Sequence, residues 1–113
     1  LFRSPTTSVV AIEDERVVGA ILCGHDGRRG CLYHVCVDPD YRRRGIGKAM
    51  IEYLIELAKK IGFEQMDLEV VDGNDNAKHL YEKCGFVETG KRMRALKDDD
   101  GTYRDEILMY RVL

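Results

Sequence analysis

The stretch that decides the fold is VDPDYRRRGIGK, residues 37–48. Asp38 and Pro39 end an extended run, because proline lacks an amide donor and keeps its predecessor extended. From Ile46 onward, apolar residues recur every three or four positions, which predicts a helix. The stretch therefore joins a strand to a helix. Free backbone N–H groups and the positive end of the helix dipole favour an anion at such a junction.

The rest of the chain extends this strand-to-helix unit in both directions. The helix beginning at Ile46 is expected to end at Gly62. A shorter helix is expected to follow an N-cap at Asn74 and to end at Gly85, with an apolar stripe of Ala77, Leu80, Tyr81 and Cys84. The apolar positions of the first helix are Ile46, Ala49, Met50, Tyr53, Leu54, Leu57, Ala58 and Ile61. Residue composition and turn signals predict strands over residues 8–12, 16–23, 31–37, 65–71, 86–93 and 103–112. The order βββαβαββ predicts an α/β fold with a mixed central sheet whose first half is antiparallel.

Composition limits the classes of protein that fit. The 113 residues suit a single domain spanning 1–113, and 44% hydrophobic with 34% charged residues indicates a packed globule. Eighteen basic against twenty acidic residues give a net charge of −2, whereas nucleic-acid binders are usually basic. No apolar run approaches the ~20 residues of a membrane span. We expect a soluble cytoplasmic protein that binds neither nucleic acid nor membrane.

The loop of residues 37–48 carries the most specific chemistry. Gly45 and Gly47 allow close backbone approach, and four cations surround them, namely Arg42, Arg43, Arg44 and Lys48. A diphosphate fits this arrangement better than a single phosphate. The spacing differs from that of a P-loop or a G-x-G-x-x-G motif. A solvated turn and a nonspecific nucleic-acid patch are the alternatives.

The four cysteines invite a disulfide or zinc interpretation. No secretory segment precedes them, so we expect reduced thiols. In an extended strand, Cys31 would face away from His34 and Cys36, which does not give convergent zinc ligands. We therefore expect no metal and interpret the cysteines as small apolar core residues.

Two motifs give the chain a family resemblance. Arg42-x-x-Gly45-x-Gly47 after Val37-Asp38-Pro39 resembles the acetyl-CoA pyrophosphate loop of the GCN5-related N-acetyltransferases (GNAT family). A second block matches on the shorter helix, Asn74-x-x-Ala77-x-x-Leu80-Tyr81-Glu82-Lys83-x-Gly85-Phe86. The match covers residues 8–113, and it is most similar to the branch that acetylates the N-terminal alanine of ribosomal proteins.

The resemblance implies a fold and a cofactor site. The strand before the loop would pair with the pantetheine arm, and the strand over residues 65–71 would splay away from it. The implied acetyl-CoA-binding residues are Val35, Cys36, Val37, Arg42, Arg43, Arg44, Gly45, Ile46, Gly47, Lys48 and Asn74. Asn74 is also a plain helix N-cap by its position.

Two residues are candidates for the chemistry of acyl transfer. Tyr81 belongs by spacing to an apolar stripe, but the resemblance makes it the proton donor to the leaving thiolate. Glu69 lies between apolar neighbours on a strand; it is either an exposed charge or, as in the alanine-specific branch, the base. His34 and Cys36 would also face the site. The sequence near Cys36 shows no residue that would act as a base for a cysteine nucleophile. We therefore prefer direct transfer of the acetyl group to a route through an acyl-enzyme.

The resemblance also sets expectations about the whole molecule. Family members usually carry a further strand and two helices before the first hairpin, so we expect an N-terminally incomplete domain that is a monomer or a homodimer. The expected reaction moves acetyl from acetyl-CoA to a primary amine on a protein N-terminus, a lysine or a small molecule. The final strands, with Arg92, Arg94 and Tyr103, would lie beside the acceptor. A non-catalytic acetyl-CoA-binding regulatory module is the alternative.

Overall fold

A computed structural model describes residues 2–3, 8–25 and 27–113. The strands are β1 (Phe2–Arg3), β2 (Val9–Glu13), β3 (Arg16–His25), β4 (Arg29–Val37), β5 (Gln65–Val71), β6 (Val87–Lys97) and β7 (Tyr103–Val112). The helices are α1 (Ile46–Ile61), α2 (Asp75–Lys83) and a 3-10 turn, η1 (Pro39–Tyr41). The predicted βββαβαββ order is confirmed, and β1 and η1 are additions to it.

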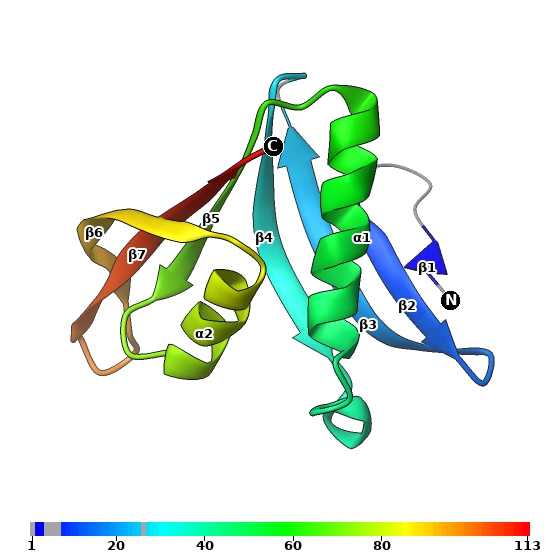
Figure 1. Ribbon diagram of the computed structural model, residues 1–113. Coiled ribbons are helices and arrows are strands. Elements are labelled where there is room, and N and C mark those ends of the chain that lie inside the picture. Colours follow the sequence, from blue (N-terminus) through cyan, green and yellow to red (C-terminus); the bar gives the residue numbers. More distant parts are fainter. Residues whose placement is uncertain (1, 4–7, 26) are drawn as a thin grey trace.

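The strands form one seven-stranded sheet in the order β1-β2-β3-β4-β5-β7-β6. Only β4 and β5 pair in parallel among these strands; the other neighbours are antiparallel. Both helices lie on one side of the sheet, α1 over β2 to β4 and α2 over β5 to β7 (Figure 1). The predicted α/β class with a mixed sheet and an antiparallel first half is confirmed.

Helix α1 has glycine at both ends. Gly45 and Gly62 adopt left-handed backbone conformations, with φ of 76° and 101°, which glycine reaches without the penalty of a side chain. Its buried residues are Met50, Ile51, Leu54, Ile55 and Ala58. Burying an aliphatic side chain of this size contributes about 1.5–3 kcal/mol. This face is what fixes the helix, and so its N-terminus, against the sheet.

The buried face of α1 is rotated from the predicted one. Tyr53 and Ile61, which were expected in the apolar stripe, are exposed, whereas Ile51 and Ile55 are buried. A 3.6-residue period over sixteen residues allows two overlapping apolar stripes, and packing against β2, β3 and β4 selects one of them.

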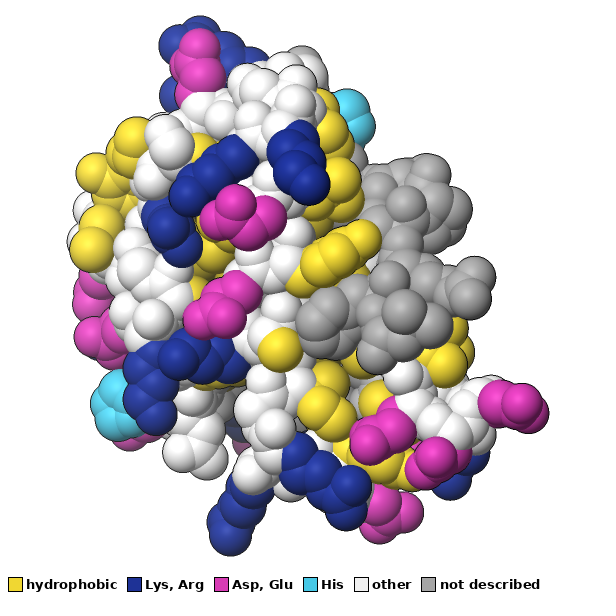
Figure 2. All heavy atoms as spheres, turned by 45° about the vertical axis from the view of Figure 1, so that its right-hand side comes forward, with side chains coloured by type: hydrophobic (Ala, Val, Ile, Leu, Met, Phe, Trp, Pro, Cys, Tyr) yellow, Lys and Arg dark blue, Asp and Glu magenta, His cyan; other side chains and the backbone are white. Residues whose placement is uncertain are grey.

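The surface matches the near-neutral composition. On the face shown in Figure 2, basic and acidic side chains are interspersed, and hydrophobic atoms are visible between them. Among the described residues, no helix combines the length and the apolar character needed to cross a bilayer.

Candidate active site

The sheet opens between its two parallel strands. β4 and β5 pair at four positions, from Arg29 with Gln65 to Leu32 with Leu68, and no pairing is recorded between them beyond that point in the described chain. β4 stays paired with β3 as far as Val37, and β5 stays paired with β7 as far as Val71. The two strands therefore diverge toward their carboxyl ends (Figure 1), and the predicted splay is confirmed.

A groove of about 640 Å³ lies along the open edge of β4. Nine of the eleven residues predicted to bind the cofactor line it, namely Val35, Cys36, Val37, Arg42, Arg43, Gly45, Ile46, Gly47 and Lys48. Ala77, Leu80 and Lys83 of α2 form its other wall. Residues from the strand, the loop and the second motif thus meet in one groove.

The N-terminus of α1 opens into this groove. The first intrahelical bond runs from the N–H of Ala49 to the carbonyl of Gly45, so the N–H groups of residues 46–48 precede the ladder of helix bonds. No side chain caps this end of the helix. Arg43 adopts a φ of 64°, and Gly45 follows with 76°, which turns the loop sharply into the helix. These donors and the helix dipole attract a bound anion.

Gly47 keeps the groove open. A Cβ at this position would lie 3.4 Å from Leu80 Cδ2 and 3.8 Å from Val37 Cγ2. The α1 N-terminus therefore approaches both β4 and α2 closely. A side chain longer than a methyl group would fill the space between them.

The three consecutive arginines diverge. Arg42 donates from Nε to the Val37 carbonyl at 3.3 Å, which ties the loop to the end of β4. Arg44 lies instead over the ring of Tyr41, 4.9 Å from its centroid, and lines a separate hollow with Ile12 of β2. The structure therefore places Arg42 and Arg43 in the groove and Arg44 outside it.

Asn74 also lies outside the groove. Its side chain accepts a hydrogen bond from the N–H of Ala77 at 3.3 Å, so it is the N-cap of α2. Asn76 lines the groove in its place. The sequence analysis missed Asn76, although its spacing of four from Leu80 puts both on one helix face.

Tyr81 packs in the core beside the groove. Its side chain is 9% exposed, and its ring meets Phe86 edge-on at 6.1 Å between centroids. Burial raises the pKa of the hydroxyl, and the thiols of Cys36 and Cys84 add to the rise. The phenol is therefore protonated at neutral pH, which a proton donor needs.

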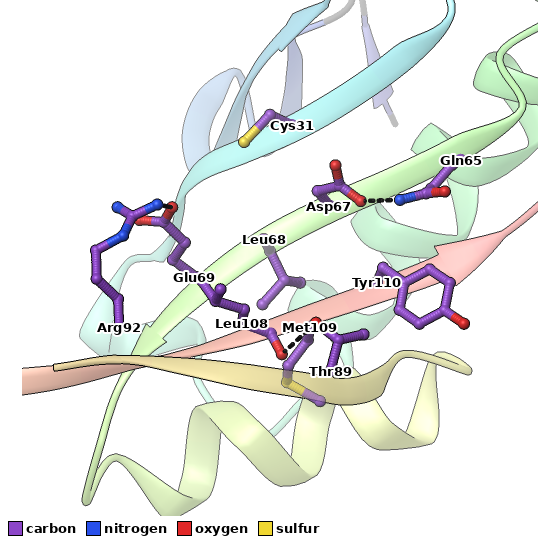
Figure 3. A pocket seen from close by; sticks show the side chains of 10 residues that line it. All are labelled: Cys31, Gln65, Asp67, Leu68, Glu69, Thr89, Arg92, Leu108, Met109 and Tyr110. Carbon is purple, nitrogen blue, oxygen red and sulfur yellow. Dashed lines mark hydrogen bonds and ion pairs between the residues drawn. The ribbon is translucent and has the colours of Figure 1, made fainter.

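Glu69 lines a second pocket, of about 530 Å³, on the other face of the sheet (Figure 3). It is the first residue of β5 beyond the last pair with β4. Its neighbours Leu68 and Val70 point into the core beneath the helices, so alternation turns Glu69 to the open face. Arg92 of β6 contacts its carboxylate at 3.0 Å. Glu69 thus lies on the open face of the sheet just beyond the last β4–β5 pair, whereas Tyr81 lies in the core beneath the helices.

The cysteines do not behave as one class. Cys23 and Cys84 are buried as expected, but Cys31 is half-buried in the second pocket and Cys36 is exposed in the groove. The interpretation of all four as core residues is therefore wrong for Cys31 and Cys36. Cys31 is still paired with β5 but lies in the pocket on the other face of the sheet, and Cys36 lies where β4 has left β5. The side chains of His34 and Arg94 lie outside the described part of the chain.

A family model agrees with the motifs. The model described as Acetyltransferase (GNAT) family matches residues 1–86. A relative from Escherichia coli K12, the [ribosomal protein bS18]-alanine N-acetyltransferase, is 41% identical over 78 residues. That match covers 69% of this chain and 52% of the relative, so the chain spans about half the length of the curated relatives it matches.

Solved structures share the fold. The ribosomal-protein-S18-alanine N-acetyltransferase of Escherichia coli superposes with a TM-score of 0.85 at 30% identity, over 93% of this chain and 67% of that one. A protein of Bacillus anthracis str. Ames, solved in complex with acetyl coenzyme A, gives 0.84 at 26% identity, over 94% and 61%. The splayed sheet, the glycine loop and the matching family model agree: the chain belongs to the GNAT acetyltransferase family.

Proposed function

We propose that this protein is an acetyl-CoA-dependent N-acetyltransferase that moves an acetyl group to a primary amine. One observation carries the proposal: a groove with cations and backbone donors lies along β4 where it has left β5, and Glu69, the first residue of β5 beyond the seam, presents a carboxylate in a pocket on the opposite face of the sheet. A transferase needs such an arrangement, because donor and acceptor must reach one reacting centre from different sides.

The groove suits acetyl-CoA in charge and in shape. The diphosphate would lie against the N-terminus of α1, where Arg42, Arg43 and Lys48 supply positive charge. The amide-bearing pantetheine arm would lie along Val35–Val37, where β4 has lost β5 as its partner and can accept a further strand. The bound acetyl-CoA of the similar Bacillus anthracis structure supports this assignment.

The candidate catalytic residues supply what acyl transfer needs. An amine attacks only as its neutral form, and Glu69 would take the proton from the ammonium directly or through a water. The nitrogen then forms a bond to the acetyl carbon while the carbon–sulfur bond breaks. The electron pair leaves on the CoA sulfur, and the Tyr81 hydroxyl would supply its proton. Transfer is direct, without an acyl-enzyme on Cys36.

The acceptor class follows from the carboxylate. Similarity to alanine N-acetyltransferases favours a protein N-terminus as the acceptor. A lysine or a small-molecule amine would also need Glu69 to remove a proton from its ammonium. The alternative is a regulatory module that binds acetyl-CoA without transferring it. The presence of both candidate catalytic residues, Glu69 and Tyr81, favours the enzyme.

Two measurements test the proposal. Acetyl-CoA at a hundred times its Kd should stabilise the fold by about 2.7 kcal/mol, which raises the Tm by several degrees. A screen of N-terminal peptides, lysine peptides, polyamines and aminoglycosides should then yield an acetylated product.

The variant Glu69→Gln tests the base. It should lower kcat/KM by about a hundredfold or more, and its pH–rate profile should lose the limb that the base creates. Glu64→Gln removes an exposed carboxylate that pairs with Arg28, far from the gap, and should leave turnover unchanged. An unmoved Tm would refute the cofactor; a Tm shift without any product would favour the regulatory module.

A further inference from the structure

Arg92 bridges two carboxylates at the mouth of the second pocket. One guanidinium nitrogen, Nη2, lies 3.0 Å from Oε1 of Glu69, and Nη1 lies 3.8 Å from Oε1 of Glu106. Figure 3 shows the arginine reaching from β6 across to Glu69 on β5. The family resemblance puts Arg92 beside the acceptor, where it could tune the charge of the acceptor mouth, but it does not single out Glu106.

Strand register brings the three side chains together. Glu69 pairs with Leu108, and Glu106 lies two residues from Leu108 on the same face of β7. Arg92 is directly opposite Glu106 in the β6–β7 ladder. Immediately after Arg92, three residues of β6 face a single residue of β7, a bulge of the kind that redirects strand side chains.

The two carboxylates differ in exposure. The Glu106 side chain is 14% exposed and that of Glu69 is 37% exposed. Burial raises the pKa of Glu106, and the charge of Glu69 and a hydrogen bond between the two carboxyl groups raise it further, while Arg92 opposes the rise. Two carboxylates this close together repel each other, so a cation bound beside both of them is favoured.

The arginine that supplies this cation is held weakly. Its side chain is 56% exposed, and a pair with this exposure contributes little net free energy, because water solvates both charges well when they part. A ligand that brings its own positive charge can therefore replace the guanidinium at small cost.

We propose that Arg92 is a built-in competitor for the acceptor: its guanidinium occupies, against Glu69 and Glu106, the position that the acceptor's ammonium takes. The inference rests on the proposed function and adds Arg92 and Glu106 as specificity-determining residues. It selects acceptors that arrive as cations and present one primary ammonium to the paired carboxylates.

The exchange also accounts for product release. The ammonium displaces Arg92, loses a proton to the carboxylate and becomes a neutral amide on acetylation. Once the carboxylate has released that proton to water, the neutral amide does not balance the two negative charges, so the guanidinium returns and the product leaves. Arg92 thus favours turnover while weakening the binding of substrate.

Other groups that face the pair come from every neighbouring strand. On β4 these are Cys31 and Tyr33; burial raises the pKa of the Cys31 thiol and Glu69 adds to the rise, so the thiol is neutral and carries no competing charge at neutral pH. On β5, Asp67 accepts a hydrogen bond from Gln65 at 2.6 Å. Tyr110 of β7 also lines the pocket, and Arg92 of β6 is the single cation among the described side chains that line it.

The test measures the binding of amines by calorimetry to protein saturated with CoA, which cannot react. Three probes are used: a short peptide with a free N-terminal alanine, lysine amide and spermidine. Arg92→Gln should bind at least one of them two- to fivefold more tightly than wild type, as expected for the loss of an exposed competing pair. Arg92→Lys keeps the charge and should bind like wild type.

Controls separate this effect from a general change of charge. Arg104→Gln removes an arginine of matched exposure that pairs with Asp98 at 2.7 Å, and it should leave the affinity unchanged. The alanine peptide with an acetylated N-terminus should not distinguish Arg92→Gln from wild type. Glu106→Gln should weaken the free amines and flatten the loss of affinity that wild type shows as the pH falls and Glu106 takes up a proton.

Unchanged or weaker amine binding by Arg92→Gln would overturn the inference, as would equal tightening in Arg104→Gln. The proposed function is judged separately, by the acetyl-CoA Tm shift and by product formation in wild type. An active enzyme with no Arg92 effect would refute the competitor alone.

Discussion

The groove and the second pocket lie on opposite faces of the sheet and are formed by different parts of the chain. Most of the wall of the groove comes from one contiguous stretch, residues 37–48, which includes the N-terminus of α1 with two glycines and three cations. The pocket is made of charged and apolar side chains from β4, β5, β6 and β7. Backbone donors at a fixed helix end suit a ligand that never varies, whereas side chains on separate strands can change one at a time to suit different acceptors.

The first prediction concerns cofactor affinity, on the groove side of this comparison. Gly45→Val puts a β-branched residue at a φ of 76°, which it can adopt only with strain. The loop must move, and with it the N–H groups at the start of α1. We expect acetyl-CoA affinity to fall at least tenfold, as measured by calorimetry.

Gly101→Val is the matched control for backbone strain. Gly101 has a φ of 88° in the turn between β6 and β7, and a Cβ there meets nothing within 4 Å. This variant should lose stability while keeping its acetyl-CoA affinity. Equal affinities in the two variants would mean that the loop geometry does not matter for binding.

Tyr81→Phe tests the boundary between the two regions. Removing the hydroxyl should lower kcat by about a hundredfold, within the usual range for a positioned proton donor, and should leave the Kd of acetyl-CoA unchanged. Tyr53→Phe, on the exposed side of α1, should retain wild-type kinetics. If Tyr81→Phe keeps the wild-type kcat, Tyr81 is not the proton donor and acts only as a core residue.

The smallest effect concerns the frame of the pocket. Lys91 of β6 donates to Asp72 at 2.9 Å, and this hydrogen bond, with the lysine charge, lowers the pKa of Asp72. A carboxyl group whose pKa is lowered in the folded state stabilises the fold at pH values above its ordinary pKa. This stabilisation is lost as the pH falls through the lowered pKa. Asp72→Asn should therefore reduce Tm by about 1 °C at pH 7, as expected for an exposed pair.

The pH dependence of that difference is the check. Thermal melts of Asp72→Asn and wild type should converge in acid. Asp99→Asn, an exposed aspartate in the β6–β7 turn, controls for the loss of one negative charge. A Tm difference that persists at low pH would assign the effect to something other than the ion pair.

Local signals in the sequence predicted the groove well. The α1 boundaries follow from a helical period closed by Gly62, and the bounds of β5 follow from alternation between Gln65 and Val71. Because the loop is contiguous, its glycines and cations could be read as one unit. The exception is Arg44, since the positive φ of Arg43 and Gly45 reverses the chain and sends adjacent side chains apart.

Long-range pairing decided what the sequence could not predict. β7 lies between β5 and β6, and no local pattern specifies that order. The contact of Glu69 with Arg92 and Glu106 depends on this insertion and on the bulge in β6. β1 has only two residues and exists through its pairing with β2, so it leaves no periodic signal.

The four paired positions of β4 and β5 have a mechanical meaning as well. Along this short seam the sheet joins one half, β1 to β4 with α1, to another, β5 to β7 with α2. Each half keeps its own antiparallel ladder when the seam parts, so the two halves can separate there without breaking either ladder. A ligand bound in the gap would contact both halves and hold them together. The cooperativity of unfolding would then rise with the fraction of protein that has ligand bound.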